Sequence, residues 1–344
     1  MKQIKSLSFI FGLGVFLIVL LPGCKNKQNE NVQLDISQAD ETVIDSLLNA
    51  YTEQLRNQPE NDVLYFKRAR LYEKKGRIIL ASQDMESAVK YEPGIVDYFN
   101  YLGDIYFQLN NIKGAIDAYE KSKTLNPSDD YSMLKLARIY LIRNEPTIAI
   151  GFLNEAMNVD KYNPETYAFK ALYYMQLQDT ARAIANLNTS VDIDPDYFNS
   201  YLDLAYLYSM KRDITALLYY ENALRIEPEN IQVLYNRGKF YQDMDSFDKA
   251  IADYEHILEM IPDYKSANYN LGYIYFLLKK YETAIQFFST AIVKDPYYIQ
   301  AYYGRGLCFA NLKNNEMAEE NFNKVLELDP EDELARKELT KLGY

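Results

Sequence analysis

Histidine and cysteine, which supply most general bases and soft metal ligands, are almost absent from this sequence. Its 344 residues include one histidine, His256, and two cysteines, Cys24 and Cys308. A catalytic site needs a nucleophile, a base or a metal gathered in a pocket, and a His/Cys metal centre needs several such ligands. We expect a solvated His256 on the outer side of a helix and an inert, buried Cys308. The sequence therefore predicts a protein that is not an enzyme and has no catalytic residue, metal or cofactor.

Four aspartates partly imitate a calcium-binding loop. Asp192, Asp194 and Asp196 alternate along the chain, and Asp203 follows eleven residues after the first of them. Calcium loops use such alternate oxygen ligands, but they need a glycine where this sequence has Tyr197. Acidic residues flank the prolines of several other segments as well. We therefore interpret these aspartates as punctuation between helices and not as a metal site.

The composition is that of a folded, acidic chain. Hydrophobic residues make up 48% of it, and the formal net charge is −12 at pH 7. So acidic a surface repels nucleic acid and anionic lipid, which excludes nucleic acid as an expected partner. No linker rich in glycine, proline or serine divides the chain, and this favours one extended array over separate domains.

Residues 1–23 have the pattern of a bacterial lipoprotein signal peptide. Two lysines precede an apolar run from Leu7 to Leu21, and the sequence Leu21-Pro22-Gly23-Cys24 follows. This resembles a lipobox, which implies cleavage before Cys24 and lipidation of that cysteine, with palmitate among the acyl chains. The alternative is an ordinary signal anchor with an incidental cysteine. The resemblance implies a lipid-anchored protein of the bacterial cell envelope that faces the periplasm or the exterior, with the outer membrane favoured.

Two short segments separate this anchor from the regular part of the chain. Residues 24–40 are polar and without period, as expected of a tether that leads away from the lipidated Cys24. Residues 41–61 contain Val43, Leu47 and Tyr51 at spacings of four. This spacing predicts a helix that belongs to an incomplete first unit.

A 34-residue unit then dominates the sequence, and residues 265–298 show it most clearly. Leu271, Gly272 and Tyr275 follow Asn268 at the i+3, i+4 and i+7 positions, so they form one stripe along a helix. A second stripe with Ala284 at its start predicts a second helix, which Pro296 ends. Small residues let the two helices approach, and one such hairpin needs neighbours to bury its stripes.

The unit occurs eight times. The aromatic residue that closes each first helix recurs in every unit. The prolines that end the units recur in all but one, where Lys161 stands, and the fifth unit is one residue shorter than the others. The predicted boundaries are 62–95, 96–129, 130–163, 164–197, 198–230, 231–264, 265–298 and 299–332.

This period and this small/aromatic/Ala/Pro pattern resemble the tetratricopeptide repeat (TPR) over residues 62–332. The resemblance implies an all-α, right-handed superhelical solenoid of about eight helical hairpins, in which the first helices line a concave groove. Residues 333–344 are charged with one apolar face, as expected of a C-terminal capping helix. Proteins of this kind bind protein partners.

Aromatic residues are concentrated at the groove positions of the sixth to eighth repeats. The expected partner-binding residues are Tyr235, Asn236, Tyr269, Asn270, Tyr273, Phe276 and Tyr303. We expect the tyrosines among them to contribute to binding and not to stability. The rival groove of the first three repeats is basic and contains Lys67, Arg70, Lys74, Lys135 and Arg138, partly offset by Asp97 and Asp104.

Two function classes remain open. The first is a lipid-anchored envelope scaffold or adaptor that holds an extended segment or helix of a protein partner in its groove, and assists assembly or localisation of an envelope complex. The alternative is a carbohydrate- or peptidoglycan-binding envelope component, because exposed tyrosines stack on sugar rings as readily as they pack against peptides.

Overall fold

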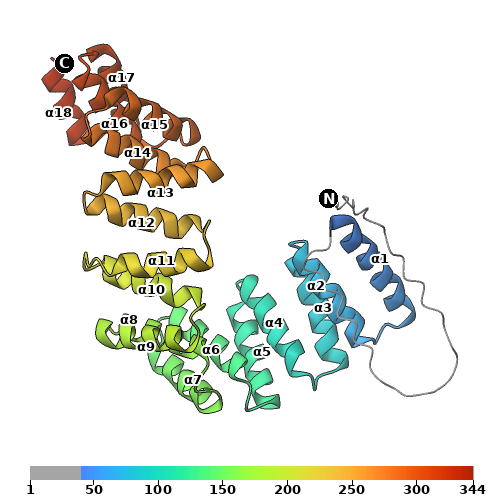
Figure 1. Cartoon of the computed structure of the whole chain (residues 1–344). Helices are drawn as coiled ribbons and strands as arrows, with labels where there is room; N and C mark the ends of the chain where they lie inside the picture. Colours follow the sequence, from blue (N-terminus) through green and yellow to red (C-terminus); the bar gives the residue numbers. More distant parts are fainter. Residues whose placement is uncertain (1–39, 344) are drawn as a thin grey trace, which may run out of the picture.

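A computed structural model describes residues 40–343, and this part of the chain contains helices and no strand (Figure 1). The predictions that concern residues 1–23, the tether and Cys24 lie outside the described residues. The helices are α1 (Glu41–Asn57), α2 (Asp62–Lys74), α3 (Ile78–Tyr91), α4 (Val96–Gln108), α5 (Ile112–Leu125), α6 (Asp130–Ile142), α7 (Pro146–Val159), α8 (Pro164–Gln176), α9 (Thr180–Ile193), α10 (Phe198–Ser209), α11 (Ala216–Ile226), α12 (Ile231–Asp243), α13 (Phe247–Met260), α14 (Lys265–Leu277), α15 (Tyr281–Lys294), α16 (Ile299–Asn311), α17 (Asn315–Leu328) and α18 (Glu333–Leu342).

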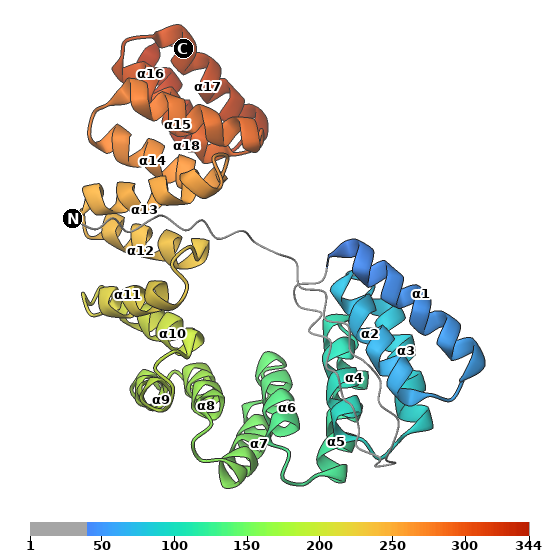
Figure 2. The same ribbon diagram turned by 45° about the vertical axis from the view of Figure 1, so that its right-hand side comes forward.

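The helices pack as successive hairpins that form one curved array. Each even-numbered helix from α2 to α16 packs against the odd-numbered helix that follows it, and each hairpin packs against the next. Figures 1 and 2 show the resulting arc, with α1 and α18 at its two ends. The prediction of an all-α solenoid is confirmed.

Seven of the eight turns inside the hairpins contain a residue other than glycine in the left-handed backbone region. Gly76 occupies this position in the first hairpin with a φ of 68°, and Lys279 occupies it in the seventh with a φ of 60°. In each turn the next backbone N–H bonds to a carbonyl in the last turn of the preceding helix, as Lys280 does to Tyr275 over 2.9 Å. The turn therefore satisfies carbonyls that the end of the helix leaves open.

Small residues on the first helices make room for large residues on the second. A Cβ atom added to Gly272 in α14 would lie 2.8 Å from the Phe288 ring of α15. Phe288 is 1% exposed, so its ring has little space into which it could move. The sequence predicted a close approach at Gly272, and the structure identifies Phe288 as the ring that lies against it. Tyr275 instead stacks on Phe287, with ring centroids 5.5 Å apart.

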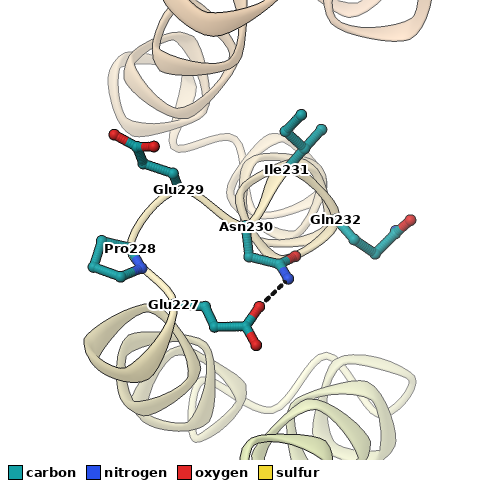
Figure 3. A pocket seen from close by; sticks show the side chains of 6 residues that line it. All are labelled: Glu227, Pro228, Glu229, Asn230, Ile231 and Gln232. Carbon is teal, nitrogen blue, oxygen red and sulfur yellow. Dashed lines mark hydrogen bonds between the residues drawn. The ribbon is translucent and has the colours of Figure 1, made fainter. Parts of the chain in front are cut away.

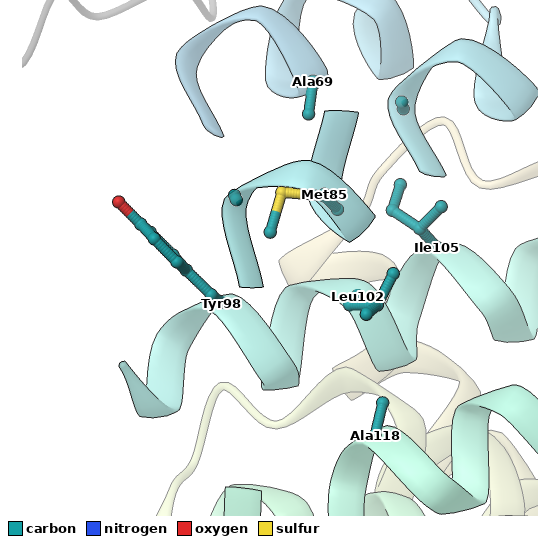
Figure 4. Packing of buried hydrophobic residues seen from close by; sticks show 8 residues of the cluster. Ala69, Met85, Tyr98, Leu102, Ile105 and Ala118 are labelled. Carbon is teal, nitrogen blue, oxygen red and sulfur yellow. The ribbon is translucent and has the colours of Figure 1, made fainter. Parts of the chain in front are cut away.

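The core is a row of local clusters between neighbouring helices. In the cluster of Figure 4, Ala69 of α2 and Met85 of α3 pack with Leu102 and Ile105 of α4, and Ala118 of α5 adds to it. No residue of this cluster comes from beyond the second repeat. Burial therefore links each hairpin to its neighbours, as expected of a solenoid.

The two ends and the shortened repeat complete the array. Helix α18 covers the last hairpin with Ala335, Leu339 and Leu342, which pack in the cluster that contains Phe322. In the short fifth repeat, α11 has 11 residues where the other second helices have 14. Within residues 40–343, none of the helices combines the length and the apolar character that a membrane crossing requires.

Candidate partner-binding groove

The even-numbered helices lie along the inner side of the arc. In the lower part of Figure 2, α4, α6 and α8 face the inside of the curve, and α5, α7 and α9 lie further out. Two pairs of first helices, α6 with α8 and α14 with α16, also touch directly across neighbouring repeats. The concave face is therefore made of first helices, as the resemblance to TPR proteins implied.

A cleft of about 360 Å³ opens on this face between α2, α4 and α6. It combines aromatic rings, two carboxylates and two cationic side chains, and one ring comes from α5. Its lining consists of Glu73, Tyr101, Asp104, Phe107, Gln108, Tyr119, Lys135, Arg138 and Ile139. The cleft lies in the first three repeats, where the sequence analysis placed the rival basic groove.

Tyrosine hydroxyls donate hydrogen bonds to both carboxylates of this cleft. Glu73 accepts a hydrogen bond from the Tyr101 hydroxyl and a second from Gln108 Nε2 over 2.7 Å. Asp104 accepts from Tyr119 over 2.7 Å and from Tyr131 over 2.6 Å. Burial, together with these carboxylates, raises the pKa of Tyr101, Tyr119 and Tyr131, so their hydroxyls remain donors. Both carboxylates are thereby held in place by the protein itself.

Three cations in or beside this cleft are less fully paired within residues 40–343. Lys135 lies 3.5 Å from Glu165 and 4.6 Å from the centre of the Tyr131 ring. Arg138 lies over Phe107, 5.4 Å from the ring centre, and within residues 40–343 it forms no ion pair. Arg70 is exposed over Phe66 at 6.0 Å. These two guanidinium groups can therefore bind an acidic or carbonyl group of a partner.

The seven partner-binding residues expected in the sixth to eighth repeats differ in their availability. Tyr273 is 39% exposed and faces solvent. Tyr269 packs against Phe288 and Tyr298, with ring centroids 5.8 and 5.0 Å apart, so it also supports the core. Rings of neighbouring helices likewise contact the remaining aromatic residues of the set, Tyr235, Phe276 and Tyr303.

The two asparagines of this set already have partners. Asn270 is buried and donates from Nδ2 to the Tyr254 hydroxyl over 3.1 Å. Asn236 accepts from Gln232 Nε2 over 2.8 Å at the surface. The structure thus leaves Asn236 and Tyr273 accessible to a ligand, whereas Asn270 and Tyr269 serve packing in the free protein. These contacts argue against the expectation that Tyr269 contributes nothing to stability, which remains to be measured.

The other candidates for chemistry are dispersed. Asp196 pairs with Arg225 over 2.9 Å, and Asp194 accepts a bond from the backbone N–H of Asp196. In the part of the chain that the structure describes, no three of the His, Cys, Asp and Glu side chains are grouped as metal ligands. His256 is half-buried. Burial raises the pKa of Cys308 to about 12, so its thiol stays protonated at neutral pH.

Four residues of the concave face were not expected there from the sequence. Tyr101, Phe107 and Tyr131 line or border the cleft, and Asp203 lies at the equivalent face of α10. The signal was available, because these residues stand at the second, sixth or twelfth position of a first helix, and each such position lies on the same side in every repeat. It was overlooked where the residue at such a position was acidic or lay in an early repeat.

A second recess of the described chain lies outside this cleft. It is formed by residues 227–232, the loop between α11 and α12 and the start of α12 (Figure 3). There Asn230 donates from Nδ2 to Glu227 over 2.6 Å, while its own side-chain oxygen caps α12. The recess therefore follows from the loop and its helix cap.

Comparisons with known proteins agree with this architecture. Profiles for the tetratricopeptide repeat match residues 66–130, 164–197, 235–299 and 299–332, which together are more than half of the chain. The TPR repeat-containing protein MJ1428 of Methanocaldococcus jannaschii is 26% identical over 218 residues, 57% of this chain and 36% of that protein. The BBSome complex member BBS4 of Bos taurus is 23% identical over 159 residues, 46% of this chain and 30% of that protein.

The chain therefore spans about a third of the length of these two relatives. Among solved structures, the APC/C hetero-tetramer Cut9-Hcn1 aligns with 88% of this chain and 58% of that one. The TM-score is 0.51 at 15% identity, which supports the likeness of the fold. The repeat matches, the stacked hairpins and the concave row of first helices lead to one conclusion: the chain belongs to the tetratricopeptide-repeat family.

Proposed function

We propose that this protein is a lipid-anchored scaffold of the bacterial envelope, which binds a segment of a protein partner in its concave groove and assists assembly or localisation of an envelope complex. The observation that carries the proposal is the concave face itself. It has an open cleft in the first three repeats and exposed rings at Tyr206 and Tyr273, and the guanidinium groups of Arg70 and Arg138 form no ion pair within residues 40–343. Such a surface offers hydrogen-bond donors and apolar area to a peptide, without any arrangement of catalytic groups.

The anchor is supported by the sequence alone. A Cys24→Ala variant is expected to lose radiolabelled palmitate and to leave the membrane fraction, because Cys24 is the only cysteine at the end of the apolar run. A Cys308→Ala variant is the matched control, since that thiol is buried in α16. Palmitate that remains on the Cys24→Ala variant would contradict the lipoprotein proposal.

Crosslinking in the native envelope tests the groove. A photoreactive amino acid is placed at Arg138 or Tyr273 on the concave face, and at Val293 of α15 as a control. Val293 is 82% exposed on a second helix, so it reports contacts made by the outer face. The proposal expects one partner protein to be captured from the groove positions and not from Val293. Equal capture at all three positions contradicts it, and adducts that are removed by muramidase favour the carbohydrate alternative.

The two parts of the groove can be compared in the same experiment. Tyr273→Ala removes an exposed ring of the seventh repeat, and Arg70→Ala with Arg138→Ala removes two guanidinium groups of the first three repeats. Loss of capture in the tyrosine variant alone supports the partner site expected in the sixth to eighth repeats. Loss in the arginine variant alone moves the site to the cleft between α2, α4 and α6.

A further inference from the structure

The Asp203 side chain lies on the concave face of the fifth repeat. It is the sixth residue of α10, as Tyr101 is of α4 and Lys135 is of α6. Both of those residues line the cleft on the concave face. Because the repeat places equivalent positions on the same side of the solenoid, Asp203 faces the groove beyond the basic part.

Asp203 has no partner for its charge. Within residues 40–343 its carboxylate accepts no hydrogen bond and joins no ion pair. The side chain is half-buried, and burial alone raises its pKa to about 6. Its oxygens are nevertheless not sealed from solvent, since among the described residues only Asn100 Oδ1 and Thr166 Oγ1 are buried side-chain polar atoms without a partner. A desolvated carboxylate that a ligand can reach, and that nothing in the protein neutralises, suits a cation.

The neighbours of Asp203 add to this preference. Tyr206 follows one helical turn later, so its ring lies on the same side of α10, and it is 49% exposed. The negative charges of Glu165 and Asp203 both act on Tyr197, the residue before α10, whose pKa burial raises to about 12. The Arg138 charge acts on the same tyrosine with the opposite sign, and within residues 40–343 it forms no ion pair with Asp203. Within residues 40–343, the concave face therefore has guanidinium groups without an ion pair in its first three repeats and a carboxylate without one in the fifth.

We propose that Asp203 and Tyr206 form a subsite for a lysine or arginine side chain of the bound segment, an inference that rests on the proposed function of the groove. An ion pair with the cation restores part of the stabilisation that the carboxylate lost when it left water. The exposed ring contributes a cation–π contact. A segment that fits this groove has a basic side chain where it contacts the fifth repeat, and acidic or polar side chains where it contacts the first three repeats.

Fluorescence anisotropy with defined peptides tests this subsite on the full-length lipidated protein in detergent. The probe is a labelled peptide of alternating glycine and lysine, and its matched control has the same lysines acetylated. Asp203→Asn removes one negative charge at the subsite. Asp248→Asn removes one negative charge from an exposed position of α13 and controls for general attraction to an acidic protein.

At about 150 mM salt, where long-range attraction is screened, we expect Asp203→Asn to weaken binding of the lysine peptide about tenfold or more. Asp248→Asn should change it less than about twofold, and Tyr206→Ala should weaken it severalfold. Equal losses for Asp203→Asn and Asp248→Asn overturn the subsite, as does a lysine peptide that binds the wild type no better than its acetylated form. Partner capture at groove positions that persists unchanged in Asp203→Asn also overturns it, while the proposed function stands.

Discussion

At the scale of single residues, the partly buried charge of Asp203 lowers the stability of the free protein. Its folded pKa of about 6 lies above the ordinary aspartate value of 3.8. Above pH 6 the carboxylate is ionised in both states, and only the folded chain bears the loss of hydration. Below pH 3.8 it is protonated in both states, so the cost disappears. The unfavourable contribution of Asp203 therefore grows as the pH rises from about 4 to about 6 and then stays constant.

This sign gives a test that does not need the partner. Asp203→Asn should stabilise the fifth repeat at pH 7.5 by roughly 1–2 kcal/mol, a value discounted for the partial exposure of the side chain. The gain should fade as the pH falls from about 6 to about 4. Thermal unfolding of wild type and variant across this range measures the difference. A gain that is the same at pH 4.5 and pH 7.5 would show that the carboxylate is not desolvated.

Arg237 and Asp253 form a buried ion pair that links α12 to α13. The guanidinium donates two hydrogen bonds to the carboxylate, over 2.9 and 2.6 Å, and the Asp253 side chain is 7% exposed. Arg237→Met should destabilise the protein by about 3 kcal/mol or more, because it leaves Asp253 buried without a cation. The equivalent residues of the seventh repeat are apolar, Leu271 and Phe287.

The double variant Arg237→Leu with Asp253→Phe copies that apolar pair into the sixth repeat. It should restore most of the lost stability, since replacing a whole buried pair by apolar side chains is often neutral. Chemical denaturation of the two variants measures both effects. If the double variant is as unstable as Arg237→Met, the loss arises from packing around the arginine and not from the stranded charge.

At the scale of the hairpin, the small residue of the first helix and the large residue sixteen positions later vary together in seven of the eight repeats. The shortened fifth repeat is the exception, because Ala205 shares its cluster with Tyr220, fifteen positions later. Glycine meets an aromatic ring in four repeats, as Gly103 meets Tyr119 and Gly272 meets Phe288. Alanine is followed by a buried aliphatic side chain in three others, as Ala137 is by Leu153. The methyl group of alanine and the width of a ring therefore compete for the same space between the helices.

This relation predicts a compensating pair. Gly272→Ala should destabilise the seventh repeat by about 1–2 kcal/mol, because the clash with Phe288 exceeds the gain in helix propensity. Phe288→Leu alone should also destabilise by about 1–2 kcal/mol, since it leaves a cavity. The double variant should lose about 1 kcal/mol less stability than the sum of the two single losses. Strict additivity in a double-mutant cycle would show that the two side chains do not share this space.

The extent to which the sequence predicts this hairpin has a physical reason. Stripe spacing fixes which side of a helix is apolar, so the helices and their order could be predicted from residues such as Leu271 and Ala284. The spacing indicates that Tyr275 of α14 and Phe288 of α15 both fill the space between the two helices, but it does not determine which of them lies at Gly272; in the structure it is Phe288. For the same reason Tyr269 was expected to be free for a ligand, although Phe288 and Tyr298 contact it.

At the scale of the whole molecule, stability comes from contacts between neighbouring helices. The clusters of the core each involve adjacent helices, and none joins the first repeats to the last within residues 40–343. A change at one end should therefore be felt over one or two repeats and not along the whole arc. Helix α18 provides the sharpest test, because it is the last element and covers a single hairpin.

Removal of residues 333–344 should expose the last hairpin without affecting the first repeats. Ala335 of α18 is fully buried against this hairpin, and Leu339 of the same helix packs in the cluster around Phe322. We expect hydrogen exchange to become faster in α16 and α17, by about tenfold or more, and to stay unchanged from α2 to α9. Leu339→Ala should give a smaller version of this pattern, whereas Leu334→Ala, at a position 59% exposed, should give none. Faster exchange spread evenly from α2 to α17 would mean that the array unfolds as one cooperative unit, which contradicts stability built from contacts between neighbours.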